Sequence, residues 1–154
     1  MSWQIFVDGA CSGNPGDSGA GIIISDQHGN EVHRDSIYLG KMTNNMAEYE
    51  ALSRGLQKAA DLGAKDVIVY TDSLLMASQV QGKYKINNDI LRQYAVGVRK
   101  VVSNFTHFTI QYIPRDKNKV ADKLAKAGIR KGVDGWSPRA SGEESPGIKG
   151  QNGS

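Results

Sequence analysis

The chain has 154 residues, a formal net charge of +3 and a hydrophobic content of 39%, which together predict one globular domain with its own core. No apolar run is long enough to cross a membrane, and the start of the chain lacks the basic and apolar regions of a secretory signal. The single cysteine, Cys11, excludes an internal disulfide and is typical of the reducing cytosol, so we expect a cytoplasmic monomer.

Apolar runs rich in β-branched residues alternate with stretches of helical periodicity. In chain order we expect strands near 3–8, 18–25, 32–39, 66–71 and 105–113, and helices near 43–62, 73–81, 90–103 and 118–130. Three strands before the first helix indicate an antiparallel meander, and the later alternation indicates parallel additions to the sheet. From residue 132 onward the chain is rich in Gly, Ser and Pro, so we divide it into a domain, 1–131, and a flexible tail, 132–154.

Two of the expected strands lead directly into an aspartate. The apolar run 5–7 is followed by Asp8, and the run 67–71 is followed by Asp72. Taken singly, Asp8 is an ordinary turn residue and Asp72 an ordinary helix N-cap. However, the carboxyl ends of neighbouring parallel strands meet at one edge of a sheet, where such folds bind ligands. The two aspartates together therefore predict a pair of carboxylates at that edge.

Two further acidic residues lie early in expected helices, on the side that faces the core. Glu48 precedes Leu52 at helical spacing, and Asp122 precedes Ala125 in a similar way. The helix macrodipole explains an acidic residue near a helix start, but it does not explain an inward position. Unpaired carboxylates inside a protein take up a proton or bind a cation, so the four acidic residues predict a metal site.

These acidic residues lie in four short strings, which are residues 8–16, 43–48, 71–73 and 118–122. In this order and spacing, over 3–130, the strings resemble the type 1 ribonuclease H family, in particular an archaeal-like branch of it. The resemblance implies the α/β ribonuclease H-like fold, with a mixed five-stranded sheet flanked by helices. It also implies an endonuclease that hydrolyses the RNA strand of RNA/DNA hybrids and leaves 5′-phosphate and 3′-hydroxyl ends.

The resemblance further implies that two divalent cations bind at the four carboxylates. Asp8 would bridge both ions, and Asp122 would share the ion on the side of the nucleophile. Glu48 and Asp72 would share the ion on the side of the leaving group. Mg²⁺ suits all-oxygen ligation and keeps several waters, leaving places for a substrate phosphate, and we expect Mn²⁺ to substitute for it.

The same motifs imply contacts to the nucleic acid. Cys11, Asn14, Asn44 and Asn45 would contact RNA 2′-hydroxyls, which distinguish RNA from DNA. Thr43 would hold a phosphate of the DNA strand. A helix N-cap is the alternative role for Thr43, and a turn residue is the alternative for Asn14.

Two more residues are expected at the substrate. Asn118 belongs to the last motif, and Lys85 follows Tyr84 in a basic and aromatic stretch, 83–85. In that stretch Tyr84 could stack on a sugar or base, with packing in the protein as the alternative.

Two features depart from many members of the family. The loop 113–118 holds Arg115 where many members carry a mobile histidine. Arginine stays protonated, so we expect Arg115 to contact the scissile phosphate and not to act as a general base, with a surface loop charge as the alternative. The stretch 81–90 is too short for the basic protrusion of some relatives. We therefore expect hybrid binding to depend on the stretch 99–131, with its nine basic and two acidic residues.

Two other functions stay open at this level. A non-catalytic module that binds hybrids or double-stranded RNA on the same fold would be expected to lack one or more carboxylates, and all four are present. A nuclease of the same broad fold that acts on DNA would not need the motifs for 2′-hydroxyls. Double-stranded RNA also stays open as a second substrate.

Overall fold

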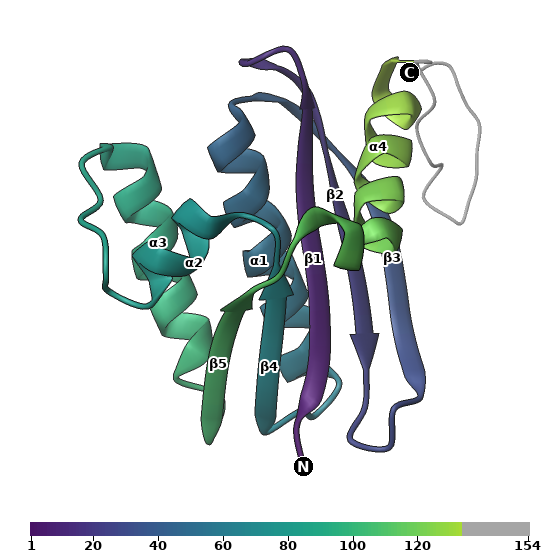
Figure 1. The fold of residues 1–154 in the computed structure, drawn as a ribbon, viewed down its shortest axis with the longest axis vertical. Helices are drawn as coiled ribbons and strands as arrows, with labels where there is room; N and C mark the ends of the chain where they lie inside the picture. Colours follow the sequence, from purple (N-terminus) through teal and green to yellow (C-terminus); the bar gives the residue numbers. More distant parts are fainter. Residues whose placement is uncertain (134–154) are drawn as a thin grey trace.

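The computed structural model describes residues 1–133, which form a five-stranded sheet with helices on both faces (Figure 1). The strands are β1 (Trp3–Ser12), β2 (Gly16–Ser25), β3 (Glu31–Met42), β4 (Asp66–Thr71) and β5 (His107–Tyr112). The helices are α1 (Asn44–Asp61), α2 (Leu74–Val80), α3 (Asp89–Val102) and α4 (Lys119–Val133), and a 3₁₀ turn (Arg115–Lys117) precedes α4.

The order of strands across the sheet is β3-β2-β1-β4-β5. β1, β2 and β3 form an antiparallel meander, while β4 lies parallel to β1, and β5 lies parallel to β4. The predicted mixed sheet is confirmed, and so is the number of its strands and helices over residues 1–133. This order makes β1 and β4 direct neighbours in the sheet although they are far apart in sequence.

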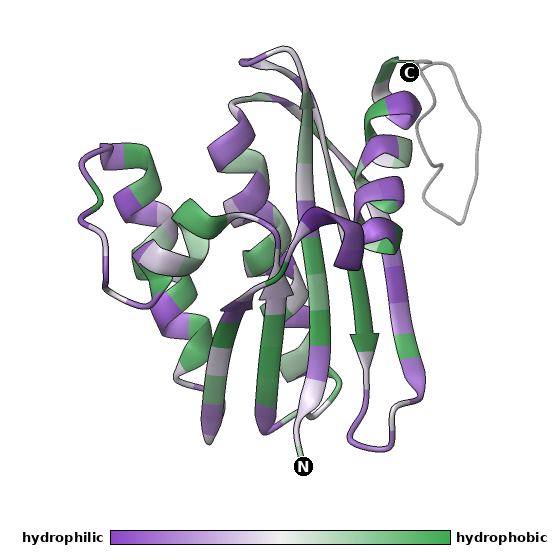
Figure 2. Cartoon of the chain, in the orientation of Figure 1, coloured by the Kyte–Doolittle hydropathy of each residue, from purple (hydrophilic) through white to green (hydrophobic). Residues whose placement is uncertain are grey.

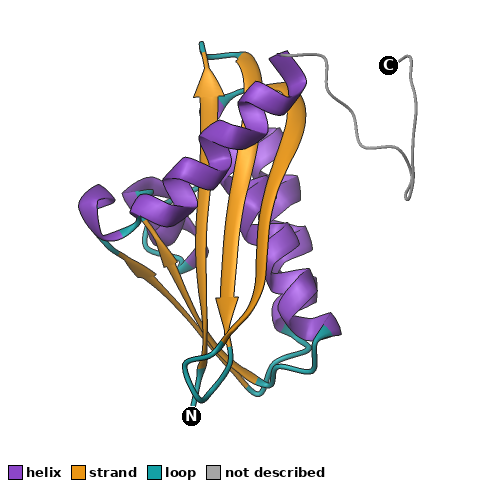
Figure 3. Cartoon of the chain, turned by 90° about the vertical axis from the view of Figure 1, so that its right-hand side faces the viewer, coloured by secondary structure: helices purple, strands orange, loops and turns teal. Residues whose placement is uncertain are grey.

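The helices divide between the two faces of the sheet. α1 lies on one face and packs against α3, and α4 crosses β2 and β3 on the opposite face (Figures 1 and 3). Apolar residues occupy the middle of β1, β2 and β4, whereas β3 is mostly hydrophilic (Figure 2). Ile5, Val7, Leu52, Leu56 and Val69 are fully buried between β1, β4 and α1. The largest part of the core therefore lies between the sheet and α1.

β1 is four residues longer than the predicted strand 3–8, so the prediction that Asp8 ends the strand is wrong. Gly9 pairs with Ala20 and Cys11 pairs with Ser18, because β2 continues beside β1 past Asp8. Gly9, in this extension of β1, serves a close contact with α1. A Cβ on Gly9 would clash with the backbone of α1 at Ala47 and Glu48, so Gly9 lets the helix approach the strand.

α4 extends to Val133, two residues beyond the predicted domain boundary at 131. The rest of the predicted flexible tail, residues 134–154, lies outside the described part of the chain. None of the helices within residues 1–133 is long and apolar enough to span a lipid bilayer.

Candidate metal centre

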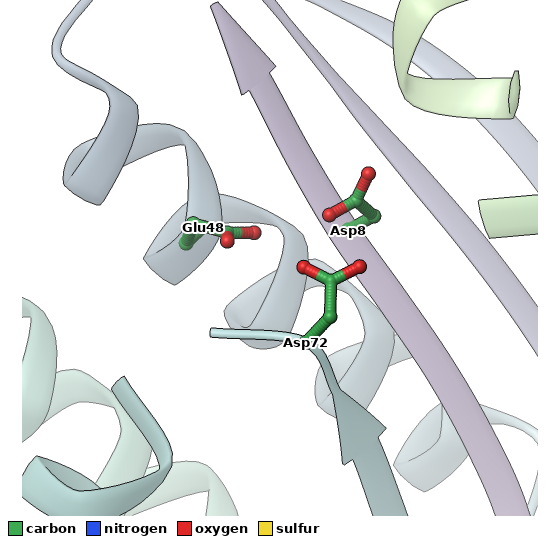
Figure 4. A group of neighbouring side chains, drawn as sticks. All are labelled: Asp8, Glu48 and Asp72. Atoms are coloured by element: carbon green, nitrogen blue, oxygen red, sulfur yellow. The ribbon is translucent and has the colours of Figure 1, made fainter. Parts of the chain in front are cut away.

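Three carboxylates from three separate elements meet at one end of the parallel pair of strands (Figure 4). Asp8 comes from β1, Glu48 from α1, and Asp72 directly follows β4. One carboxylate oxygen from each residue lies within 4.8 Å of those of the other two. Only 3% of Asp8 and 5% of Glu48 are exposed to solvent. This is the convergence that the sequence predicts for these three residues.

The register between β1 and β4 sets Asp8 beside Asp72. Phe6 is the parallel partner of Tyr70, and their rings stack with centroids 4.8 Å apart. Asp8 lies two positions beyond Phe6 in β1, and Asp72 follows the end of β4 two positions beyond Tyr70, so the parallel register brings both aspartates to the same end of the two strands. The stacked rings of Phe6 and Tyr70 thus pack next to the two aspartates.

Glu48 is brought to the pair by the close packing of α1 on β1. Thr43 caps α1, because its Oγ1 accepts a hydrogen bond from the Met46 N–H at 3.2 Å. Glu48 lies in the second turn, where the backbone N–H of Gly9 donates to its Oε1 at 2.6 Å. This bond fixes one oxygen of the Glu48 carboxylate against β1, next to Asp8.

Asp72 is available to the cluster because its neighbour caps the following helix. The alternative considered for Asp72 was the N-cap of that helix, but the cap is Ser73, whose Oγ accepts from the Met76 N–H at 3.1 Å. The carboxylate of Asp72 instead accepts a hydrogen bond from the side-chain amide of Asn118 at 3.2 Å. Asp72 is thus held toward Asp8 and α4.

Burial and the neighbouring acidic groups disfavour the ionised forms of Asp8 and Glu48. Burial, followed by the charges of Glu48 and Asp72, raises the pKa of Asp8 from 3.8 to about 9. Burial raises the pKa of Glu48 from 4.5 to about 8, although the hydrogen bond from Gly9 and the charge of Arg115 act in the opposite direction. A divalent cation at the three carboxylates would relieve this repulsion, and their oxygens are the ligands that Mg²⁺ prefers.

Asp122 lies beside the three carboxylates and not among them. Its side chain forms a hydrogen bond with Asp8 that contributes to the raised pKa of Asp8. It also forms an ion pair with Lys126, one turn further along α4, at 3.1 Å between Nζ and Oδ2. The fourth predicted carboxylate therefore adjoins Asp8 from the opposite face of the sheet, and 18% of its side chain is exposed.

A family model described as reverse transcriptase-like matches residues 6–128. Ribonuclease HI of Halobacterium salinarum is 36% identical over 124 residues, which cover 80% of this chain and 62% of that relative. The crystal structure of RNase H1 from the same archaeon superposes with a TM-score of 0.82 at 34% identity, covering 85% of this chain and 99% of that one.

The chain belongs to the type 1 ribonuclease H family. It is similar also to LC11-RNase H1, a metagenomic protein from compost that was solved in complex with an RNA/DNA hybrid. That structure has a TM-score of 0.81 and 36% identity, over 86% of this chain and 99% of the other. The present chain spans less than two thirds of the curated Halobacterium relative.

Among the residues expected at the substrate of a ribonuclease H, four lie around the turn between β1 and β2 and the start of α1. The backbone N–H of Asn44 donates to Oδ1 of Asn14 at 2.9 Å, which ties the turn to the helix. The thiol of Cys11 lies 3.3 Å from the carbonyl oxygen of Met42. Asn44 and Asn45 are exposed at the first turn of α1.

Thr43 has the capping role that was its alternative, and it also lines a pocket. The pocket has a volume of about 320 Å³ and lies between the N-termini of two helices, α1 and α3. Asn14, Thr43 and Asn45 form one side of it, and Asn88 and Ile90 lie on the other. Asn88 was not among the predicted site residues. It is the N-cap of α3, and its position just before the helical pattern of 90–103 is a signal that could have predicted this cap.

The remaining expected residues lie in different surroundings. Lys85 is exposed in the loop between α2 and α3, and Tyr84 beside it is 55% exposed. Arg115 is exposed in the 3₁₀ turn, and its charge acts on Glu48 across the site. Asn118 is only 2% exposed and lies beneath the carboxylates. A contact between Asn118 and the substrate stays a prediction.

Proposed function

We propose that this protein is an endoribonuclease that hydrolyses the RNA strand of RNA/DNA hybrids. The observation that carries the proposal is the convergence of Asp8, Glu48 and Asp72, with ligand oxygens within 4.8 Å of one another. Membership of the ribonuclease H family supports it, as does the similarity to LC11-RNase H1, which was solved with such a hybrid. We infer 5′-phosphate and 3′-hydroxyl product ends, as the family resemblance implies.

The donor set of the site fits Mg²⁺, with Mn²⁺ as a substitute, because every side chain in it offers carboxylate oxygen. We assign Asp8 to both ions of a pair, Asp122 to the ion near the nucleophile, and Glu48 and Asp72 to the ion near the leaving group. When bound, such a pair activates a water and stabilises the leaving oxygen. The role of the chain itself is to hold the carboxylates at this spacing and to neutralise the phosphate.

Arg115 is the residue best suited to neutralise the scissile phosphate. It is exposed, and its charge lowers the pKa of Glu48, which indicates that the guanidinium lies within electrostatic range of the carboxylates. Arginine cannot accept a proton, so in this proposal Arg115 binds a phosphate oxygen, and a water or a substrate oxygen takes the proton.

The pocket between α1 and α3 is suited to a phosphate of the DNA strand. The pocket lies at the N-termini of both helices, whose caps Thr43 and Asn88 line it, and the positive end of a helix dipole favours an anion there. The residues that line the pocket carry no charged side chain, so none of them would repel a phosphate. Beside the pocket, Asn14, Asn44 and Asn45 would contact RNA 2′-hydroxyls together with Cys11.

A basic stripe on α4 would extend this surface. It consists of Lys119, Lys123, Lys126 and Arg130, which are exposed and recur about once per helical turn. α4 begins directly after Asn118, which donates to Asp72, and from there it runs across β2 and β3 (Figure 1). A strand whose phosphate lies at the carboxylates could therefore follow the stripe, with binding that weakens as salt rises.

The test uses one labelled RNA strand, paired with DNA, paired with RNA, or left single. Each substrate is incubated with Mg²⁺, Mn²⁺ or chelator, and the Asp8→Asn variant serves as the matched control, because it removes a charge and keeps the shape. We expect metal-dependent cleavage of the hybrid that the variant lacks, with 5′-phosphate ends on the products. Cleavage of the RNA duplex as well would add double-stranded RNA to the substrates.

The outcome that contradicts the proposal is intact RNA in every arm while the hybrid is still bound. Binding without cleavage would favour the rival function, a module that recognises hybrids. Cleavage of a DNA duplex in a parallel reaction would instead favour a nuclease that acts on DNA.

A further inference from the structure

Asn118 lies at a junction of three elements beneath the carboxylates. Its side-chain Nδ2 donates to the carbonyl oxygen of Val7 at 2.9 Å and to Oδ2 of Asp72 at 3.2 Å. Its backbone carbonyl accepts from the N–H of Asp122 at 3.1 Å. Val7 directly precedes Asp8. One residue therefore contacts β1 next to Asp8, the end of β4 at Asp72, and the first turn of α4 at Asp122.

The amide of Asn118 can have only one orientation. Both of its N–H donors are used, one on each acceptor, and its Oδ1 is buried without a hydrogen-bond partner in the described structure. If the amide were turned over, Oδ1 would face the carbonyl of Val7 and the carboxylate of Asp72, which are both acceptors. The amide therefore keeps its Nδ2 toward the two acceptors, the carbonyl oxygen of Val7 and Oδ2 of Asp72.

This arrangement does not favour stability. A buried acceptor without a partner is unfavourable, and native proteins contain few such groups. A purely structural residue in a site that is 98% buried would be expected to satisfy all its polar atoms or to be apolar. The residue that occupies this position instead places a donor against a carboxylate of the cluster.

We propose that Asn118 is a positioning residue of the metal centre, which holds the Asp72 carboxylate at a fixed place relative to Asp8 and Asp122. The inference rests on the proposed function, because it takes the three carboxylates as ligands of a divalent cation. It also replaces the role in substrate binding that the sequence motif predicts for Asn118. Residues that hold metal ligands by hydrogen bonds commonly contribute about 10–100-fold to metal affinity.

The test measures cation binding without reference to catalysis. Mn²⁺ is titrated calorimetrically into the wild-type protein and into the Asn118→Ala and Asn118→Leu variants. Leucine has the same branched arrangement of heavy atoms as asparagine and removes both donors together with the unpartnered acceptor, so unlike alanine it does not leave a cavity. We expect both variants to bind Mn²⁺ about 10–100-fold more weakly than the wild type.

The matched control is Ser36→Ala. Ser36 Oγ donates to the carbonyl oxygen of Leu124 at 2.6 Å, so this variant also removes a side-chain hydrogen bond to α4, but away from the carboxylates. We expect it to lose some stability and to keep the Mn²⁺ affinity of the wild type.

A second readout separates positioning from substrate binding. Hybrid affinity is measured in chelator by fluorescence anisotropy, and kcat and KM are measured at limiting Mn²⁺. Positioning predicts that the Asn118 variants keep their hybrid affinity and KM and lose kcat. A loss of hybrid affinity in chelator with unchanged Mn²⁺ binding would overturn the inference in favour of substrate contact.

Mn²⁺ binding distinguishes a wrong role for Asn118 from a wrong proposed function. Wild-type binding of Mn²⁺ that is retained in both Asn118 variants would overturn the role of Asn118 alone. A wild-type protein that binds no Mn²⁺ would overturn the proposed function and this inference together.

Discussion

At the scale of single residues, the site combines burial with like charge. Asp8 and Glu48 are buried next to Asp72, and their pKa values are raised to about 9 and about 8. Without a cation, both groups therefore keep a proton at neutral pH, and binding of a cation would release it. Cation affinity should accordingly rise with pH over the neutral range.

The first prediction concerns Asp8→Asn in the absence of metal. In the wild type, the unfolded chain releases the Asp8 proton near pH 3.8 while the folded chain keeps it up to about pH 9. The folded state then binds more protons than the unfolded state, so the free energy of unfolding falls as pH rises through this window. The variant lacks this loss, and we expect it to be more stable than the wild type at pH 8, by up to about 6 kcal/mol.

Urea unfolding in chelator at several values between pH 4 and pH 9 measures this difference. The two proteins should be similar at the acid end and should diverge toward the alkaline end. Saturating Mg²⁺ should stabilise the wild type and leave the variant unchanged. A difference that does not vary with pH would show that Asp8 does not hold the proton.

The second prediction concerns Arg115→Ala. Loss of one charge-assisted hydrogen bond to phosphate, about 1.5–3 kcal/mol, should slow single-turnover cleavage of the hybrid about 10–100-fold without abolishing it. The control is Arg54→Ala, which removes an exposed arginine that pairs with Glu50 on α1 and should change the rate less than about two-fold. Equal rates for the wild type and the Arg115 variant would reject the assigned role.

Not every residue of the site could be predicted from its sequence context. Asp8, Glu48 and Asp72 were predictable because each is an acidic residue where an apolar pattern continues or ends. The position of Asn118 was not, because its partner, the carbonyl oxygen of Val7, is 111 residues away and belongs to the backbone. Sequence alone allows either Asp72 or Ser73 as the N-cap of α2. Because Ser73 is the cap, the carboxylate of Asp72 is left for the cluster.

At the scale of elements, close packing of helices on the sheet positions the site. The bounds of β4 agree with the prediction, since an isolated apolar run has clear ends. The end of β1 does not, because Gly9 serves the contact with α1, and a contact between distant elements leaves no local signal. On the opposite face, α4 lies against Gly21 of β2, where a Cβ would clash with the backbone of Ala121.

The third prediction follows from this contact. Gly21→Ala should displace α4 and lower the free energy of unfolding by about 1–3 kcal/mol, as overpacking does. Asp122 and Asn118 lie at the start of α4, so we expect weaker Mn²⁺ binding as well. The control is Gly97→Ala on α3, where a Cβ meets no atom within 4 Å.

In the control, alanine should raise stability by about 0.5–1 kcal/mol because it is a better helix former than glycine. Chemical denaturation and calorimetric titration of both variants provide the measurement. If Gly21→Ala were as stable as the wild type, the contact between α4 and β2 would be looser than the structure indicates.

At the scale of the whole molecule, the strand order β3-β2-β1-β4-β5 assembles the site from segments spread over more than a hundred residues. Neither β1 nor β4 holds a complete set of ligands. The α4 helix adds Asp122 from one face, and α1 adds Glu48 from the other (Figure 3). The same arrangement places the basic stripe of α4 next to the carboxylates.

The fourth prediction concerns this stripe. The double variant Lys123→Ala and Arg130→Ala, made in the Asp8→Asn background to prevent cleavage, should bind the hybrid more weakly. The slope of log affinity against log salt should decrease by about 1 for each side chain removed. Fluorescence anisotropy over a range of salt concentrations measures both effects.

The matched control is Lys58→Ala with Lys65→Ala. These lysines lie near the end of α1 and before the start of β4, at the opposite end of the parallel strands from the carboxylates. Their removal changes the net charge by the same amount and should leave the slope nearly unchanged. Equal changes in the two double variants would mean that overall charge, and not the stripe, governs binding.

The buried carboxylates have a consequence for how such a sequence persists through evolution. At neutral pH the folded chain must keep a proton on Asp8 and Glu48 that the unfolded chain releases, and replacing either acid by its amide removes this cost, so either change is expected to make the cation-free fold more stable. Natural selection for folding alone would let such replacements accumulate, since stabilising changes are accessible to most proteins. A chain that keeps both acids therefore gives up stability in the cation-free state, and a bound cation would restore it.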